Sequence, residues 1–168
     1  MTPRKIIIDT DPGQDDAFAI LFALGSPDEL EVVGVTAVGG NVPLALTAVN
    51  ALKVVELAGR PDIPVFAGCP APMVRPLMTA EYVHGETGLD GADLPEPATR
   101  LQDEHAVNYM VRAIMEAPEG DITVCTLGPM TNLTMAMTME PRIIPRIREV
   151  VLMGGGFFEG GNATPAAE

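Results

Sequence analysis

Four aspartates lie within eight residues near the start of the chain: Asp9, Asp11, Asp15 and Asp16. Carboxylates this close together raise one another's pKa unless a positive charge lies between them. A helix N-terminus supplies only about half an elementary charge, and the nearest basic residues, Arg4 and Lys5, lie at the far end of the apolar run that precedes the cluster. The cluster therefore indicates a bound cation. Because the segment offers oxygen ligands without histidine or cysteine, we expect a hard ion, Ca²⁺ or Mg²⁺, and a cage of several carboxylates with a backbone carbonyl favours Ca²⁺.

Three other interpretations of the cluster explain it less well. In the simplest, Asp9 caps a turn, Asp15 caps a helix and the other two are solvated, but this does not explain why all four crowd one place. An EF-hand loop needs acids at alternate positions and a glutamate at the twelfth, which the spacing does not provide. A phosphatase of the haloacid dehalogenase type also starts with a hydrophobic run and Asp-x-Asp, but it expects threonine soon after the second aspartate, where this chain has Pro12-Gly13.

Alternating strand and helix patterns surround the acidic cluster. The β-branched run at residues 6–8 predicts a strand buried on both faces. After Asp15 the period changes, since Phe18, Leu21 and Phe22 are spaced three and four apart, and this predicts a helix that ends at Gly25. The predicted strands are 4–9, 30–38, 63–67, 122–126 and 149–153, the predicted helices start at 15, 43, 104 and 130, and 68–102 is predicted to be a long loop.

This order of elements predicts a single α/β domain over residues 1–168, with a parallel, Rossmann-like open sheet and helices on both faces. Ligands of such sheets bind beyond the carboxyl ends of the strands. The unusual clusters of the sequence all follow predicted strands, at 9–16, 39–41, 126–132 and 153–162. We therefore expect the active site at the carboxyl ends of the strands.

The composition narrows the classes of partner. Ten lysines and arginines against 23 aspartates and glutamates give a net charge of −13, which repels phosphate backbones and anionic lipids, so neither nucleic acid nor a membrane surface is an expected partner. No apolar stretch reaches the 18 or so residues of a membrane span. The two cysteines, Cys69 and Cys125, lack the spacing of a metal or redox motif, which favours a reducing, cytoplasmic location.

Five ordered motifs carry a resemblance to a known family. The segment from Ile6 to Ala17 resembles the N-terminal signature of the inosine-uridine preferring nucleoside hydrolases, and the similarity continues along the chain. The motifs are IIIDTDPGQDDA (6–17), VGGN (38–41), HGETG (84–88), TLGPMTN (126–132) and VLMGGG with GNAT (151–156 and 161–164).

The resemblance implies roles for individual residues. Asp11 would bind Ca²⁺ and act as the general base toward the attacking water, Asp16 would bind the ion with both carboxylate oxygens, and Thr126 would bind it with its main-chain carbonyl. Asp9 would orient the turn, and His84 would lie on a mobile loop near the base. The residues implied to contact the ribose are Asp15, Asn41, Met153, Asn162 and Glu168.

The family also implies an activity and an assembly. An N-ribosidic bond breaks through an oxocarbenium-like transition state, which negative charge around the ribose and a nearby activated water stabilise. The resemblance thus implies Ca²⁺-dependent hydrolysis of a ribonucleoside to ribose and free base, by a homodimer or homotetramer. Because family members are about twice as long, the chain is expected to lack a C-terminal half. A ribose- or calcium-binding module without turnover is therefore the alternative, and the phosphatase a more distant one.

Overall fold

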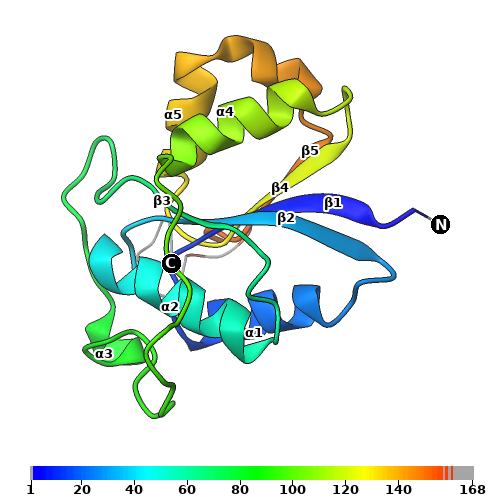
Figure 1. The fold of residues 1–168 in the computed structure, drawn as a ribbon. Coiled ribbons are helices and arrows are strands. Elements are labelled where there is room, and N and C mark those ends of the chain that lie inside the picture. Colours follow the sequence, from blue (N-terminus) through cyan, green and yellow to red (C-terminus); the bar gives the residue numbers. More distant parts are fainter. Residues whose placement is uncertain (1, 157, 159, 161–168) are drawn as a thin grey trace.

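A single parallel sheet forms the centre of the computed structural model, which describes residues 2–156, 158 and 160. The strand order is β3-β2-β1-β4-β5, and every neighbouring pair is parallel. This confirms the predicted α/β class with an open parallel sheet (Figure 1). The strands are β1 (Arg4–Thr10), β2 (Leu30–Ala37), β3 (Val65–Ala67), β4 (Ile122–Thr126) and β5 (Glu149–Leu152).

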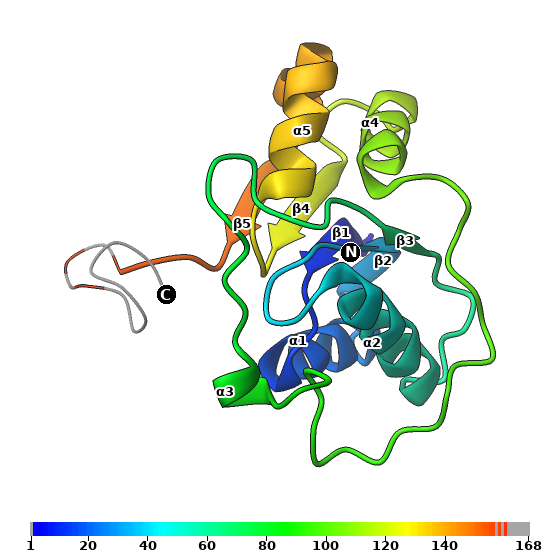
Figure 2. The ribbon, with the colours of Figure 1, turned by 90° about the vertical axis from the view of Figure 1, so that its left-hand side faces the viewer.

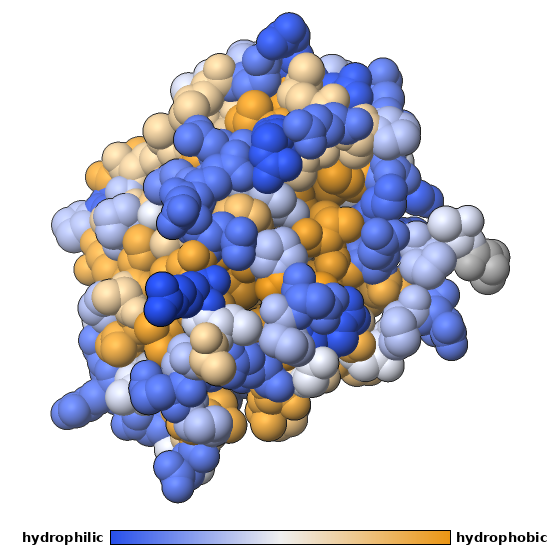
Figure 3. Space-filling model, in the orientation of Figure 1, coloured by the Kyte–Doolittle hydropathy of each residue, from blue (hydrophilic) through white to orange (hydrophobic). Residues whose placement is uncertain are grey.

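Helices cover both faces of the sheet, as Figures 1 and 2 show. On one face lie α1 (Gln14–Leu24) and α2 (Leu44–Leu57), and on the other lie α4 (Ala106–Glu116), α5 (Thr131–Met139) and the 3-10 helix η1 (Pro141–Arg146). The outward side of α4 is a hydrophilic band in Figure 3, where Arg112 pairs with Glu104 and Glu116. Among the described residues, no helix has both the length and the apolar composition needed to cross a bilayer.

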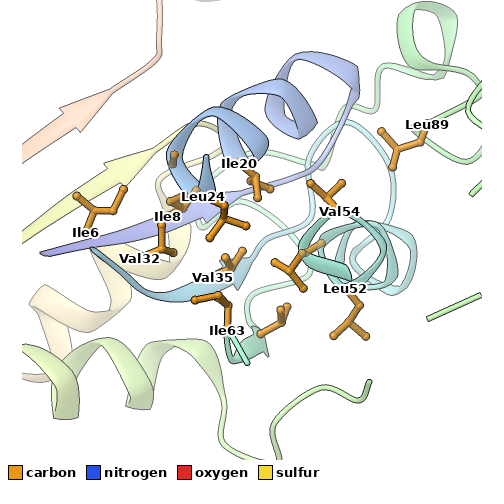
Figure 4. Packing of buried hydrophobic residues seen from close by; sticks show 14 residues of the cluster. Ile6, Ile8, Ile20, Leu24, Val32, Val35, Leu52, Val54, Ile63 and Leu89 are labelled. Carbon is orange, nitrogen blue, oxygen red and sulfur yellow. The ribbon is translucent and has the colours of Figure 1, made fainter. Parts of the chain in front are cut away.

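The central strand β1 divides the hydrophobic core into two clusters. Ile6 and Ile8 pack with residues of α1 and α2, while Ile7 packs on the opposite side with residues of α4 and α5. Figure 4 shows the first of these clusters. Because successive side chains of a strand point to opposite faces, the run of three isoleucines in the middle of β1 contributes to both clusters.

Helix α1 forms where it was predicted, but its two phenylalanines do not face the core. Phe18 and Phe22 are 73% and 76% exposed, and the buried residues of the helix are Asp16, Ile20, Ala23 and Leu24. These four positions follow the i, i+4, i+7, i+8 spacing of one helical face. The face is chosen by Asp16, whose hydrogen bonds hold it against the end of β1, so the two phenylalanines turn outward.

The segment between β3 and α4 is irregular, as predicted, apart from the single turn α3 (Glu81–His84). Side chains of α2 hold this segment along its length. Asn50 donates to the Thr87 carbonyl at 2.8 Å, and Glu56 accepts hydrogen bonds from the main-chain N–H groups of Ala98 and Thr99. The long loop therefore lies across the molecule in a defined path.

Candidate functional site

Three site residues predicted from the sequence meet where β1 and β2 end. Asp11 follows β1, Asp16 lies in the first turn of α1, and Asn41 follows β2. The Asn41 main-chain N–H donates to Asp11 Oδ2 at 2.7 Å, and its Nδ2 donates to the Asp11 carbonyl at 3.0 Å and to Asp16 Oδ2 at 3.2 Å. Asn41 thus ties the two carboxylates together.

Local structure explains the position of Asp16. Its Oδ1 accepts from the Thr10 hydroxyl at 2.7 Å, and its Oδ2 accepts from the Gly13 N–H at 3.1 Å. Gly13 is the N-cap residue of α1, so Asp16 satisfies one of the free N–H groups at the start of the helix. The same carboxylate that caps the helix therefore faces Asp11.

Two glycines make room for the Asp11 carboxylate. A Cβ atom at Gly40 would overlap Asp11 Oδ2, and one at Gly128 would overlap Asp11 Oδ1. Gly40 belongs to the loop after β2 and Gly128 to the loop after β4, so main chain from both sides of β1 touches this side chain. Any other residue at either glycine would have to displace Asp11.

Burial dominates the electrostatics of the site. It raises the pKa of Asp11 to about 8, with the Asp16 charge adding to the shift and the hydrogen bond from Asn41 opposing it. Burial likewise raises the pKa of Asp16, against the hydrogen bond from Thr10. The two basic residues nearest in sequence are engaged elsewhere, since Arg4 pairs with Glu149 and Lys5 with Asp121. An added cation would stabilise both ionised carboxylates.

The donors suit a hard divalent cation. Asp11 and Asp16 offer carboxylate oxygens, the ligand type that Ca²⁺ and Mg²⁺ prefer. In the part of the chain that the structure describes, however, no three histidine, cysteine, aspartate or glutamate residues are grouped closely enough to hold a metal ion. The Thr126 carbonyl, the third expected ligand, accepts a hydrogen bond from the Met153 N–H at 2.9 Å, which leaves it one lone pair for another partner.

The predicted ribose contacts are only partly brought together. The Asp15 side chain is 68% exposed and lies 3.9 Å from His84 Nε2, measured from its Oδ1. Met153 follows the edge strand β5 and is 39% exposed. Asn162 and Glu168 lie outside the described residues.

His84 lies against the start of α1, although it comes from the long loop. A Cβ at Gly13 would overlap its imidazole ring, and His84 Nδ1 forms a hydrogen bond with Gln14 Oε1. Asn50 links the loop to the same turn, because its Nδ2 donates to the Thr87 carbonyl at 2.8 Å and to the Pro12 carbonyl at 3.1 Å. The predicted loop residue therefore reaches the turn that holds the acidic cluster.

Asp9 lies beneath this turn and is fully buried. Its Oδ1 accepts from the Thr36 hydroxyl at 2.7 Å and from Asn132 Nδ2 at 2.8 Å, while its Oδ2 and the Thr126 hydroxyl have no hydrogen-bond partner within the described structure. Burial raises the pKa of Asp9 to about 7, against the hydrogen bonds from Asn132 and Thr36. No role was assigned to Asn132 from the sequence; its signal in the sequence is a carboxamide in the first turn of an apolar helix, within the motif that follows β4.

Known proteins of one family are similar to this chain. The chain matches the family described as inosine-uridine preferring nucleoside hydrolase over residues 6–168. It is 47% identical to the inosine-uridine preferring nucleoside hydrolase of Crithidia fasciculata, across 99% of this chain and 52% of the relative. It is equally identical to the pyrimidine-specific ribonucleoside hydrolase RihB of Escherichia coli, across all of this chain and 52% of that protein.

A solved structure shows the same fold. The plant nucleoside hydrolase PpNRh1 superposes with a TM-score of 0.89 at 41% identity, covering 99% of this chain and 52% of that one. The chain thus spans about half the length of the relatives it matches. Family members are commonly metal-dependent hydrolases, which fits the paired carboxylates at the strand ends. With the family match over residues 6–168 and this similarity to its members, the chain belongs to the inosine-uridine preferring nucleoside hydrolase family.

Proposed function

We propose that this protein hydrolyses the N-glycosidic bond of ribonucleosides, releasing ribose and the free base, and that it requires Ca²⁺. The observation that supports this most is the Asp11 carboxylate, held beside Asp16 by Asn41 and enclosed by the glycines at 40 and 128. Such a rigidly held acid at the carboxyl ends of parallel strands is suited to act on a bound ligand.

In this proposal Asp11 is the general base. It accepts a proton from the attacking water at a carboxylate oxygen, so it must be ionised before each turnover. Asn41 favours the ionised form through its N–H group. Asp11 and Asp16 would hold the Ca²⁺, with the Thr126 carbonyl as a further ligand. The chemistry that a hard divalent cation supplies at such oxygens is acidification of water and attraction of paired hydroxyl groups.

The ribose would be held by residues around this centre. Asp15 is exposed at the start of α1 and can accept hydrogen bonds from hydroxyl groups. Asn41, Met153, Asn162 and Glu168 are proposed for the remaining ribose contacts, and His84 for a contact from the loop side. Negative charge around the sugar favours the oxocarbenium-like transition state.

Ribose release tests the activity. Purified protein is incubated with inosine and with uridine, once with Ca²⁺ and once with a chelator, and reducing sugar is measured. We expect sugar release that the chelator abolishes and added Ca²⁺ restores. Asp62→Asn is a matched control, because Asp62 pairs with Arg60 on the surface and the substitution removes one carboxylate far from the site. Release unaffected by the chelator would contradict the calcium requirement.

A binding module without turnover is the second candidate. The observation that favours it is that the described residues bring together fewer than three potential acidic, histidine or cysteine ligands. Calorimetric titration with Ca²⁺ separates the candidates, because binding without sugar release at any protein concentration supports the module. Phosphate release from phosphomonoesters would instead support the more distant phosphatase alternative.

Base preference requires a panel of substrates. One relative is described as inosine-uridine preferring and another as pyrimidine-specific, although both are 47% identical to this chain. Relative kcat/KM values for purine and pyrimidine nucleosides would establish the preference. A cytoplasmic location stays a prediction from the spacing of the two cysteines, and a dimeric or tetrameric assembly stays a prediction of the family resemblance.

A further inference from the structure

Asn132 is a polar residue in the first turn of α5 with no exposed surface. Its carboxamide makes three hydrogen bonds. Nδ2 donates to Asp9 Oδ1 at 2.8 Å and to the Ala37 carbonyl at 3.1 Å, and Oδ1 accepts from the Cys69 N–H at 2.8 Å. Since it uses both donors and its acceptor, the carboxamide is satisfied in a fully buried place.

The three partners of Asn132 belong to three different parts of the sheet. Asp9 is near the end of β1, Ala37 ends β2, and Cys69 lies two residues beyond the end of β3. The chain at Gly68 runs so close to the carboxamide that a Cβ there would overlap it. One side chain of α5 thus joins the carboxyl ends of β1, β2 and β3.

Each of these attachment points leads directly to the carboxylate site. Asp9 precedes Asp11 by two residues. The Cys69 carbonyl accepts from the Gly39 N–H at 2.9 Å, and two residues further on, the Asn41 N–H donates to Asp11 Oδ2. Asn132 is therefore connected to Asp11 along β1 and, independently, through the loop that follows β2.

We propose that Asn132 is a positioning residue for the site formed by Asp11, Asp16 and Asn41. It holds the ends of β1 and β2 and the segment after β3 in one register, and this sets the place of the Asn41 N–H relative to the Asp11 carboxylate. The role needs a carboxamide, because an aspartate would face the Asp9 carboxylate and a leucine would leave the Cys69 N–H without an acceptor. Only the consequence for turnover rests on the proposed function.

Amide hydrogen exchange tests the positioning role without any substrate. We compare Asn132→Ala with Leu133→Ala, a control in the same helix that empties an equally buried position but whose side chain forms no hydrogen bond with the three partners. In Asn132→Ala, we expect the amides of Cys69, Gly39 and Asn41 to exchange about tenfold faster relative to the central β1 amides. A factor of about ten is the scale of one lost hydrogen bond. Leu133→Ala should leave these ratios unchanged. Equal ratios in the two variants would overturn the proposal.

A reciprocal exchange of side chains covers the case in which Asn132→Ala does not fold. Asn132→Asp alone places two carboxylates in contact, whereas Asp9→Asn combined with Asn132→Asp restores one carboxylate and one carboxamide of nearly unchanged volume. We expect the Asn41 amide to exchange more slowly in the double variant than in Asn132→Asp. If the double variant protects it no better, the contact with Asp9 does not position the site.

Turnover supplies a readout that general destabilisation does not mimic. Because outer-shell partners typically affect activity by about 10–100-fold, Asn132→Ala should lower kcat by about that factor. The KM should change less than kcat, because Asn41 is only one of the proposed ribose contacts and Asp15 on α1 is not attached to Asn132. A larger effect on KM than on kcat would contradict the proposal. If the parent releases no ribose, the proposed function fails while the exchange experiment still decides the role of Asn132.

Discussion

The centre and the edge of the sheet contain similar apolar sequences but differ in their surroundings. Ile6, Ile7 and Ile8 of β1 are at most 4% exposed, since strands lie on both sides and helices on both faces. Val150, Val151 and Leu152 of β5 are 37–52% exposed, and within the described residues β5 pairs only with β4. The comparison shows that hydrophobicity alone does not reveal which strand forms the core.

The candidate site residues also differ between the centre and the edge of the sheet. Asp11, Asp16 and Asn41 follow or adjoin strands at the centre, and they are joined by hydrogen bonds from several segments. Met153 follows the edge strand and is held there by the ladder bond to Thr126. Parts of the site that depend on β1 are therefore more rigidly positioned than those that depend on β5.

Substitution at the centre of the site gives the largest expected effect. Asp11→Ala removes both the proposed base and a metal ligand, so we expect turnover to fall by at least about 10²–10⁴-fold, the range for loss of general acid–base catalysis. Asp16→Ala should mainly weaken Ca²⁺ binding. Ribose release and calorimetric titration measure the two effects. Turnover of Asp11→Ala within about tenfold of the parent, only about 1.4 kcal/mol in barrier, would refute its assignment as the base.

Truncating one apolar side chain in β1 and one in β5 compares how much the centre and the edge of the sheet contribute to the free energy of unfolding. Ile7→Ala opens a cavity in the fully buried core and should lower the free energy of unfolding by about 2–5 kcal/mol. Val151→Ala removes a half-exposed side chain and should cost less than about 1 kcal/mol. Urea denaturation measures both. Equal losses would mean that the β5 edge is covered in solution.

The buried carboxylates predict that the free energy of unfolding of the metal-free protein depends on pH. Because the folded-state pKa is raised to about 8 for Asp11 and about 7 for Asp9, the folded state binds more protons than the unfolded state above about pH 4. The free energy of unfolding should therefore fall as the pH rises from about 4 to about 8, by at most about 1.4 kcal/mol per pH unit for each group.

Denaturation in the presence of a chelator at pH 5 and pH 8 measures this loss. Asp11→Asn should reduce it, since the neutral carboxamide does not ionise, and Ca²⁺ should reverse it in the parent. Asp62→Asn, at the surface, should leave the loss unchanged. A parent protein equally stable at both pH values would show that the carboxylates ionise freely when buried.

A charge on the edge strand gives the smallest expected change in stability. Within the described residues, the outer edge of β5 has no neighbouring strand, and its exposed valines and leucine favour association between chains. We expect the molecular mass in sedimentation to rise with protein concentration, and Val151→Lys should reduce this rise with a change in unfolding free energy within about 0.5 kcal/mol, as for surface substitutions. Unaltered association would place the contact elsewhere.

Local patterns in the sequence were sufficient for much of the fold. The β-branched run before Asp9 predicts β1, the alternating periods predict a parallel sheet between helices, and the predicted elements match the observed ones to within about two residues at most ends. The acidic cluster also predicts the location of the site. These inferences succeed because they depend on neighbours in the chain, which the sequence displays directly.

Other features were decided only by the tertiary structure. The choice of the Asp16 face of α1 follows from contacts with the end of β1 and leaves Phe18 and Phe22 outside. Asn132 meets Asp9 across 123 residues of chain, and β1 becomes central only because β4 pairs beside it. Periodicity reports which residues share a face, whereas the partner of that face depends on strand order and long-range packing, which no local pattern contains.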